Sequence, residues 1–171
     1  MFRSSFAMVV MGLALAACRP AAPPPPAVAV AFDPKAAAHI RQEGSAKITG
    51  QAFLVLPGGQ TRLAAGEVVR LVPDSAYARA RFETLYQGRK FVRARDWTNI
   101  PADPAYTEFT RTTTTTSAGY FTFDRVAPGR YFVATQKVYR PQDALFPEGG
   151  AMYETVEVKD GETARVVVVG R

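Results

Sequence analysis

The feature that most constrains the fold is a stretch of alternating residues between positions 112 and 135. Two turn signals, at 117–119 and 127–129, divide it into three short extended segments. In the middle segment Phe121 and Phe123 recur with a period of two, which places both on one face of a strand. The threonine run before it is β-branched and favours an extended backbone. The stretch therefore predicts three consecutive β-strands. Its core residues are expected to be Phe121, Phe123, Val126 and Tyr131.

Four further strand patterns lie outside this stretch, at 46–56, 67–72, 153–158 and 163–169. In the first two segments, apolar or small residues stand at every second position, and Val69 and Leu71 are expected to point inward. The four consecutive valines at 166–169 indicate a strand that is buried on both faces or an edge covered by the insertion at 74–105. A chain of 171 residues suits one domain. We therefore expect a mainly β fold, a single antiparallel seven-stranded β-sandwich.

A different period interrupts the strands at 74–105, which we interpret as an insertion. Asp74 or Ser75 is a suitable helix N-cap. Ala78, Phe82 and Leu85 then recur at helical spacing and form one apolar stripe. The pattern predicts a helix at about 74–88 that lies on the sandwich with this stripe inward.

The central stretch also resembles a known family. The string Gly119-x-Phe121-x-Phe123-x-x-Val126-x-Pro128-Gly129-x-Tyr131 is similar to the signature of carboxypeptidase regulatory-like domains, which are transthyretin-like (prealbumin-like) β-sandwiches. The resemblance extends over about 44–169, apart from the insertion. It implies an accessory, spacing or binding module, and it implies no catalytic residues.

The N-terminus has the pattern of an export signal. A positive start is followed by an apolar run at 6–17 that is too short to span a bilayer. The run ends in Leu15-Ala16-Ala17-Cys18, which is similar to the lipobox of bacterial lipoproteins, and Cys18 is the only cysteine. We expect residues 1–17 to be a lipoprotein signal peptide and Cys18 to carry the lipid. The alternative is an ordinary signal peptide that happens to end near a cysteine.

A proline- and alanine-rich segment follows Cys18. Such a sequence favours polyproline II and cannot form a core, so residues 18–43 are predicted to be a linker and residues 44–171 the domain. At about 3.1 Å per residue, roughly twenty such residues could hold the domain up to ~60 Å from the bilayer. The single histidine, His39, is expected to be solvated there. In enterobacterial lipoproteins an aspartate after the lipidated cysteine tends to retain the protein at the inner membrane. Arg19 stands at that position here, so the resemblance implies an outer-membrane location. We also expect the domain to face the periplasm.

The candidate binding residues lie in the insertion, where aromatic side chains stand among basic ones. They are Arg89, Lys90, Phe91, Arg93, Arg95 and Trp97, which we call the 89–97 cluster. The basic members could bind an anion, and the aromatic members could stack on sugar rings. Alternatively, the charges form a solvated helix face and the aromatic side chains seal the insertion against its domain.

Catalytic patterns are weak in this sequence. It has no Cys/His metal spacing, no nucleophile elbow and no phosphate-binding loop, so we expect neither a cofactor nor an enzyme. The carboxylates that could form an acid/base pair are Asp103, Glu108, Asp124 and Glu148. The export signal argues against nucleic acid as a partner. We expect a membrane-anchored structural or interaction module of the cell envelope that contacts an envelope protein or a glycan. The alternative is a carbohydrate- or peptidoglycan-binding lipoprotein that uses the 89–97 cluster.

Overall fold

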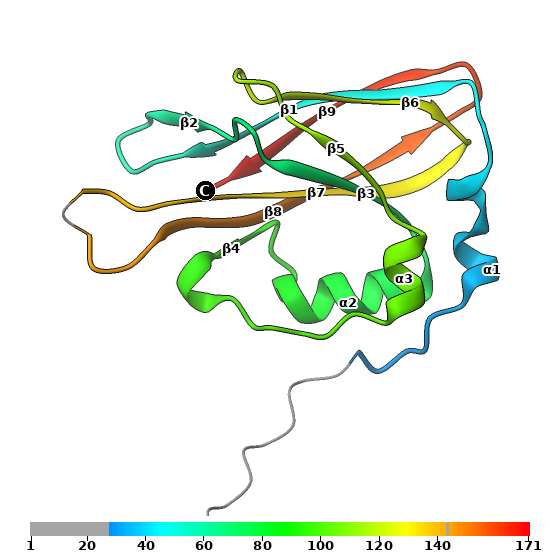
Figure 1. Cartoon of the computed structure of the whole chain (residues 1–171), viewed down its shortest axis with the longest axis horizontal. Coiled ribbons are helices and arrows are strands. Elements are labelled where there is room, and N and C mark those ends of the chain that lie inside the picture. The colour runs from blue at the N-terminus through cyan, green and yellow to red at the C-terminus, as the bar shows by residue number, and fades with distance from the viewer. Residues whose placement is uncertain (1–27, 143) are drawn as a thin grey trace, which may run out of the picture.

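Two β-sheets and a layer of helices make up the fold, as Figure 1 shows. The structure is a computed structural model and describes residues 28–142 and 144–171. Cys18 and most of the predicted linker therefore lie outside the described residues. The two sheets face each other, and the helices α2 and α3 cover the outer face of the second sheet.

The first sheet is built around the strand β1 (Ala46–Val55). Along one edge, the first part of β1 pairs antiparallel with β6 (Tyr120–Val126), and its last residues pair antiparallel with β2 (Thr61–Leu63). Along its other edge it pairs in parallel with β9 (Thr163–Gly170). The first and last strands of the domain therefore lie side by side.

The second sheet contains five antiparallel strands. Their order across the sheet is β4 (Phe91–Arg93), β8 (Glu148–Val158), β7 (Gly129–Tyr139), β3 (Val68–Pro73) and β5 (Arg111–Thr114). The long β7–β8 hairpin forms the middle of this sheet, and β4 and β5 form its two edges.

The described helices are short, and several are capped by the residues that precede them. They are α1 (Pro34–Ala37), the 3-10 helix η1 (Ala38–Arg41), α2 (Ala76–Tyr86), the 3-10 helix η2 (Ala94–Asp96) and α3 (Pro104–Glu108). Ser75 caps α2 by accepting a hydrogen bond from the backbone N–H of Ala78 at 3.1 Å. None of the described helices is long and apolar enough to cross a membrane.

The main core lies between the two sheets, where the inward positions of the alternating strands meet. The four core residues predicted from the central stretch are confirmed, because all four are buried there. Phe121 contacts Phe123 edge to face, with 6.2 Å between the ring centroids. Val69 and Leu71 also point inward as expected. The mainly β sandwich is thus confirmed.

Four details of the predicted sandwich need correction. The described chain has nine strands where seven were expected, because β2 and β4 are only three residues long and carry too little pattern to be recognised. The pair β1–β9 is parallel, not antiparallel. Val167 is 54% exposed, so β9 is not buried on both faces, and the insertion covers the other sheet.

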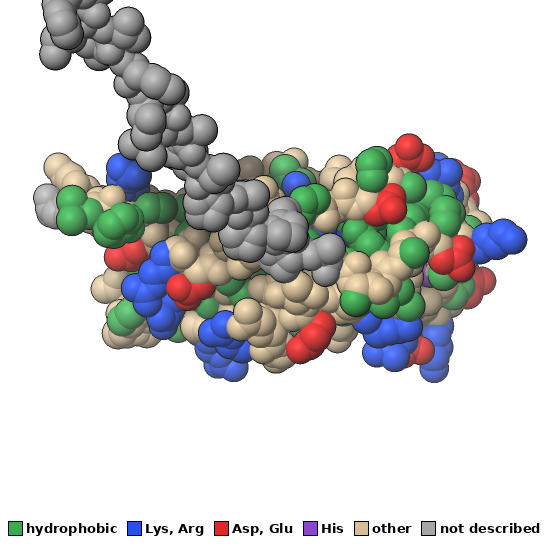
Figure 2. Space-filling view, turned by 90° about the horizontal axis from the view of Figure 1, so that it is seen from below, with side chains coloured by type: hydrophobic (Ala, Val, Ile, Leu, Met, Phe, Trp, Pro, Cys, Tyr) green, Lys and Arg blue, Asp and Glu red, His purple; other side chains and the backbone are tan. Residues whose placement is uncertain are grey.

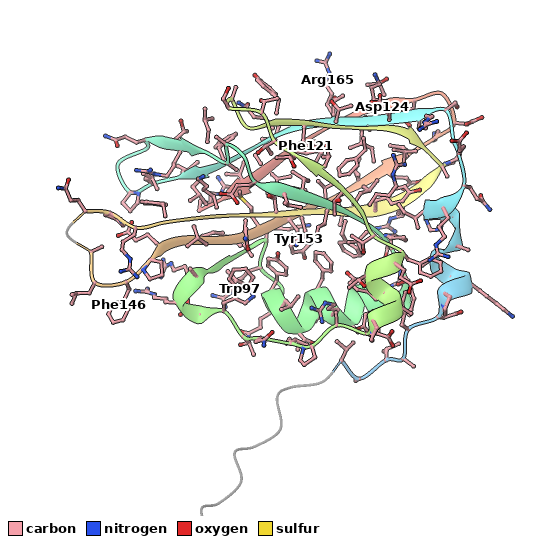
Figure 3. All side chains as sticks on the ribbon, viewed as in Figure 1. Trp97, Phe121, Asp124, Phe146, Tyr153 and Arg165 are labelled. Carbon is pink, nitrogen blue, oxygen red and sulfur yellow. The ribbon has the colours of Figure 1, made fainter. Side chains whose placement is uncertain are left out.

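A second core lies between the second sheet and α2. Phe82 stacks on Phe132 of β7, with ring centroids 4.3 Å apart, and meets Tyr153 of β8 edge to face at 4.7 Å. Figure 3 shows Tyr153 between the sheet and this helix. The predicted apolar stripe of the insertion therefore packs inward, with Ala78 and Phe82 buried and Leu85 half-buried.

The segment before Gly44 contributes to the packed unit instead of acting only as a linker. Ala37 and Ile40 are buried in the main core, and the ring of Phe32 packs edge to face against Tyr77, Tyr106 and Phe109. The expectation that His39 is solvated is wrong. Its Nε2 is buried without a hydrogen-bond partner in the described part of the chain, and its ring centroid lies 5.3 Å from that of Tyr131.

Candidate functional site

A groove of about 520 Å³ lies on the outer face of the second sheet, between the sheet and the insertion. We call it the sheet groove. Its floor comes from outward-facing positions of neighbouring strands, including Arg70 of β3, Thr112 of β5 and Ala134 of β7. Thr112 and Ala134 are the direct register partners of Arg70. Ala134 and Ala151 have small side chains, which leave the groove open between α2 and the segment after η2.

One wall of the sheet groove is α2, and the other is the segment 97–110. The two walls are joined by Arg81, whose guanidinium donates hydrogen bonds to the backbone oxygens of Ile100 (2.9 Å) and Pro101 (3.0 Å). The Tyr77 hydroxyl accepts a hydrogen bond from the backbone N–H of Asp103 at 2.9 Å. These bonds fix a segment that otherwise has little regular structure, so the groove has a defined shape.

Two tyrosines from opposite walls line the sheet groove, Tyr86 from α2 and Tyr106 from α3. The two residues are only 5% and 8% exposed. Burial raises the pKa of both phenols above the ordinary value of 10.0, while the nearby positive charge of Arg70 acts to lower the pKa of each. Both phenols are therefore protonated hydrogen-bond donors at neutral pH.

The rim of the sheet groove carries the only tryptophan of the chain, Trp97. It is 47% exposed, and Figure 3 shows it on the helical side of the second sheet. Asn99 and Gln136 also line the groove and add side-chain amides. The lining thus combines a partly exposed aromatic ring with hydroxyl, amide and guanidinium groups.

The 89–97 cluster does not form a single surface. Only Trp97 of its six members lines the sheet groove. Lys90 lies over the ring of Tyr153, 4.3 Å from the centroid, and pairs with Glu154 at 3.4 Å. The guanidinium of Arg89 contacts Gln87 at 3.4 Å and lines neither of the two cavities described here.

The remaining members, Phe91, Arg93 and Arg95, line a second cavity of about 750 Å³ at one end of the sandwich. We call it the end cleft. The β7–β8 loop closes its other side with Leu145 and Phe146, which are 86% and 72% exposed. Figure 2 shows hydrophobic side chains beside Lys and Arg side chains at this end of the molecule. The end cleft is therefore mainly apolar, with arginines along its edge.

Catalytic groups do not converge in either cavity. The four scattered carboxylates each have a local partner: Asp103 caps α3, Glu108 pairs with Arg41 at 3.1 Å, Asp124 pairs with Lys47 at 2.9 Å, and Glu148 accepts a hydrogen bond from the Tyr139 hydroxyl at 2.7 Å. Among residues 28–142 and 144–171, no group of three or more His, Cys, Asp or Glu residues is arranged to hold a metal ion. Among the described residues, no carboxylate, histidine or cysteine lines the sheet groove.

Sequence reasoning missed Arg70, the residue at the centre of the groove floor. Its only sequence signal is its position, since it stands between Val69 and Leu71 and so faces away from the main core. That alternation is typical of a solvent-facing strand residue. Nothing in it indicates that the insertion covers the same face of the sheet.

No protein-family model matches the sequence, and no curated protein matches it. Among solved structures, the fold is similar to PA1324 of Pseudomonas aeruginosa, named as a candidate carbohydrate binding protein. The TM-score is 0.68 at 22% identity, over 81% of this chain and 97% of that one. A second structure, the minor pilin GBS52 of Streptococcus agalactiae, gives a TM-score of 0.39 at 15% identity over 74% of this chain and 44% of that one. At this level of identity, the first likeness shows a shared fold.

Proposed function

We propose that this chain is a non-catalytic, lipid-anchored binding module of the bacterial cell envelope, and that its ligand is a glycan held in the sheet groove. One observation carries the proposal: the groove places a partly exposed tryptophan beside hydroxyl, amide and guanidinium groups that converge from two walls and a floor. A sugar offers a C–H face that packs on an aromatic ring, and hydroxyl groups that pair with polar side chains. Recognition sites commonly combine a shaped cavity with a few fixed polar groups.

The composition of the groove favours binding over hydrolysis. Most glycosidases cleave the bond between sugars with a pair of carboxyl groups that flank it. The sheet groove is lined by no Asp or Glu, so its residues offer no such pair. The name of the Pseudomonas protein, which has the same fold, adds support for a carbohydrate ligand.

The anchor and the location rest on the sequence. The lipobox-like string ending at Cys18 supports a lipid anchor, and an exported lipoprotein meets envelope glycans directly. The resemblance to carboxypeptidase regulatory-like domains is consistent with a non-catalytic role and stays a prediction, as does the outer-membrane location.

Titration of the full chain with envelope oligosaccharides tests the glycan proposal, with the fluorescence of the single tryptophan as the signal. The detergent should have no sugar headgroup. We expect at least one oligosaccharide to quench or shift the Trp97 emission, and isothermal titration calorimetry to show about tenfold weaker binding for Trp97→Ala. A tenfold change corresponds to about 1.4 kcal/mol, within the range for an aromatic contact.

Tyr120→Ala is the matched control for Trp97→Ala. Tyr120 is also an exposed aromatic residue, at 55%, but it lies on β6 of the first sheet and lines neither cavity. The control should bind like the wild type. Equal losses in the two variants, or no binding to any oligosaccharide of the panel, would contradict the proposal.

A second candidate function is contact with an envelope protein at the end cleft. The observation in its favour is the pair Leu145 and Phe146, exposed beside Phe91 at a mainly apolar cavity. Here the test is a pull-down from envelope extract at low and moderate salt, comparing the wild type with Arg93→Glu/Arg95→Glu. An identical set of captured proteins in both, without salt dependence, would exclude a role for these arginines.

A further inference from the structure

We propose that the ligand of the sheet groove carries an oxyanion, a carboxylate or a phosphate ester on the sugar, and that Arg70 binds it together with the hydroxyls of Tyr86 and Tyr106. This inference deepens the proposed glycan-binding function and rests on it.

The charge of the lining is the first argument. Of the residues that the structure describes, two arginines, Arg70 and Arg81, and no acidic side chain line the sheet groove. The guanidinium of Arg81 is already engaged with the backbone oxygens of Ile100 and Pro101. A cavity with an excess of positive charge attracts anions and is less favourable for cations.

The second argument is that Arg70 is unpaired among the described residues. Five other arginines have carboxylate partners, as in Arg41–Glu108 at 3.1 Å and Arg79–Asp74 at 2.7 Å. Arg70 is in none of the ion pairs found in the described part of the chain. Its planar guanidinium is therefore free to form the two parallel hydrogen bonds that suit a carboxylate or a phosphate.

The position of Arg70 is the third argument. It extends from the floor between Thr112 and Ala134, whose side chains are too short to cover it. Arg70 lines the same groove as Tyr86 and Tyr106, and its positive charge acts to lower the pKa of both phenols. Both tyrosines are more than nine-tenths buried.

The guanidinium of Arg70 and the hydroxyls of Tyr86 and Tyr106 are together suited to bind an oxyanion. Such an anion has several lone pairs directed to different sides, and leaving one of them unpaired in a cavity is costly. Arg70 belongs to the floor of the groove, and the two tyrosines belong to its opposite walls. Since both phenols are protonated at neutral pH, each can donate a hydrogen bond to the anion.

The test uses matched acidic and neutral sugars. The probes are the disaccharide of N-acetylglucosamine and N-acetylmuramic acid, its methyl ester, N-acetylglucosamine 6-phosphate, and chitobiose, together with an array of acidic, phosphorylated and neutral oligosaccharides. Binding to the full chain is measured in a detergent without a sugar headgroup, by tryptophan fluorescence for the four soluble probes and by labelled protein on the array. We expect the best-bound acidic or phosphorylated sugar to bind at least tenfold more tightly than its neutral counterpart.

Three variants assign the preference to the proposed groups. Arg70→Gln should reduce the acid-to-neutral ratio to below twofold, mainly by weakening the binding of the acidic sugar. The double variant Tyr86→Phe/Tyr106→Phe should lower the ratio several-fold. Arg165→Gln is the matched control, because Arg165 is also an exposed strand arginine without an ion pair among the described residues, but on the first sheet (Figure 3). It should change nothing.

The outcomes separate this inference from the function on which it rests. Equal binding of acidic and neutral sugars, or a preference that survives Arg70→Gln, would overturn the oxyanion and leave glycan binding intact. Binding of no sugar at all would overturn both. All variants should keep the thermal midpoint of the wild type, which excludes loss of fold as the cause.

Discussion

Phe82→Ala should strongly destabilise the domain, because Phe82 joins the insertion to the second sheet. Its ring stacks on Phe132 and also contacts Tyr86 and Tyr153, with centroid distances of 4.3, 5.5 and 4.7 Å. The residue is only 5% exposed. The substitution therefore leaves a cavity surrounded by three rings that cannot close together without breaking their own contacts.

The expected loss follows from the buried area. An aromatic side chain buries about 200 Å², which at about 25 cal/mol per Å² corresponds to ~5 kcal/mol for full removal. Alanine retains a small part of that area, so we expect the free energy of unfolding to fall by about 4 kcal/mol, within the usual 3–5 kcal/mol for Phe→Ala in a core. A domain of this size is stable by only about 5–15 kcal/mol, so the loss is a large part of the total.

Urea unfolding, followed by circular dichroism and by the fluorescence of Trp97, measures this loss. The matched control is Phe146→Ala, which removes the same side chain where it is 72% exposed and should cost less than about 0.5 kcal/mol. A loss below about 1 kcal/mol for Phe82→Ala, or equal losses in the two variants, would show that the insertion does not pack on the sheet. The sheet groove would then lack a fixed wall.

Three further predictions concern other parts of the chain. Cys18→Ser should leave an unprocessed precursor without a lipid, and a variant that still matures and floats with membranes would refute the lipobox interpretation. Arg93→Glu/Arg95→Glu should change the free energy of unfolding by less than about 1 kcal/mol, because exposed charges contribute little, and thermal unfolding checks this. Burial lowers the pKa of His39 below 6.5, so the unfolded chain takes up the proton more readily and stability should fall as the pH falls below about 6.5. Urea unfolding at several pH values should show this slope in the wild type and a smaller one in His39→Gln; equal slopes would refute it.

The sequence by itself determined seven of the nine described strands and, where apolar residues alternate, their inner faces. Alternation with a period of two is a local property, because successive side chains point to opposite faces whatever the strand pairs with. It therefore identified Phe121, Phe123, Val69 and Leu71 as core residues before any partner was known. In the same way, Ser75 and the stripe containing Phe82 determined the start and the buried face of α2.

Sequence proximity did not determine which residues form a surface. Phe91 and Trp97 are six positions apart in one cluster, yet they line different cavities. Phe91 belongs to the edge strand β4, where the alternation of side chains places it toward the sandwich interior. The 3-10 helix η2 then turns the chain before Trp97. A three-residue strand and a single 3-10 turn carry too few residues for a periodic signal.

Tertiary structure alone decided the candidate site. Arg70, Tyr86 and Tyr106 come from a strand and from two helices that flank η2, and they meet because the insertion folds back over the sheet from which it departs. The parallel contact of β1 with β9 and the packing of Phe32 on Tyr106 are likewise long-range. Such contacts depend on which apolar faces cover one another, and many pairings satisfy the same local patterns. Only the assembled chain selects one of them.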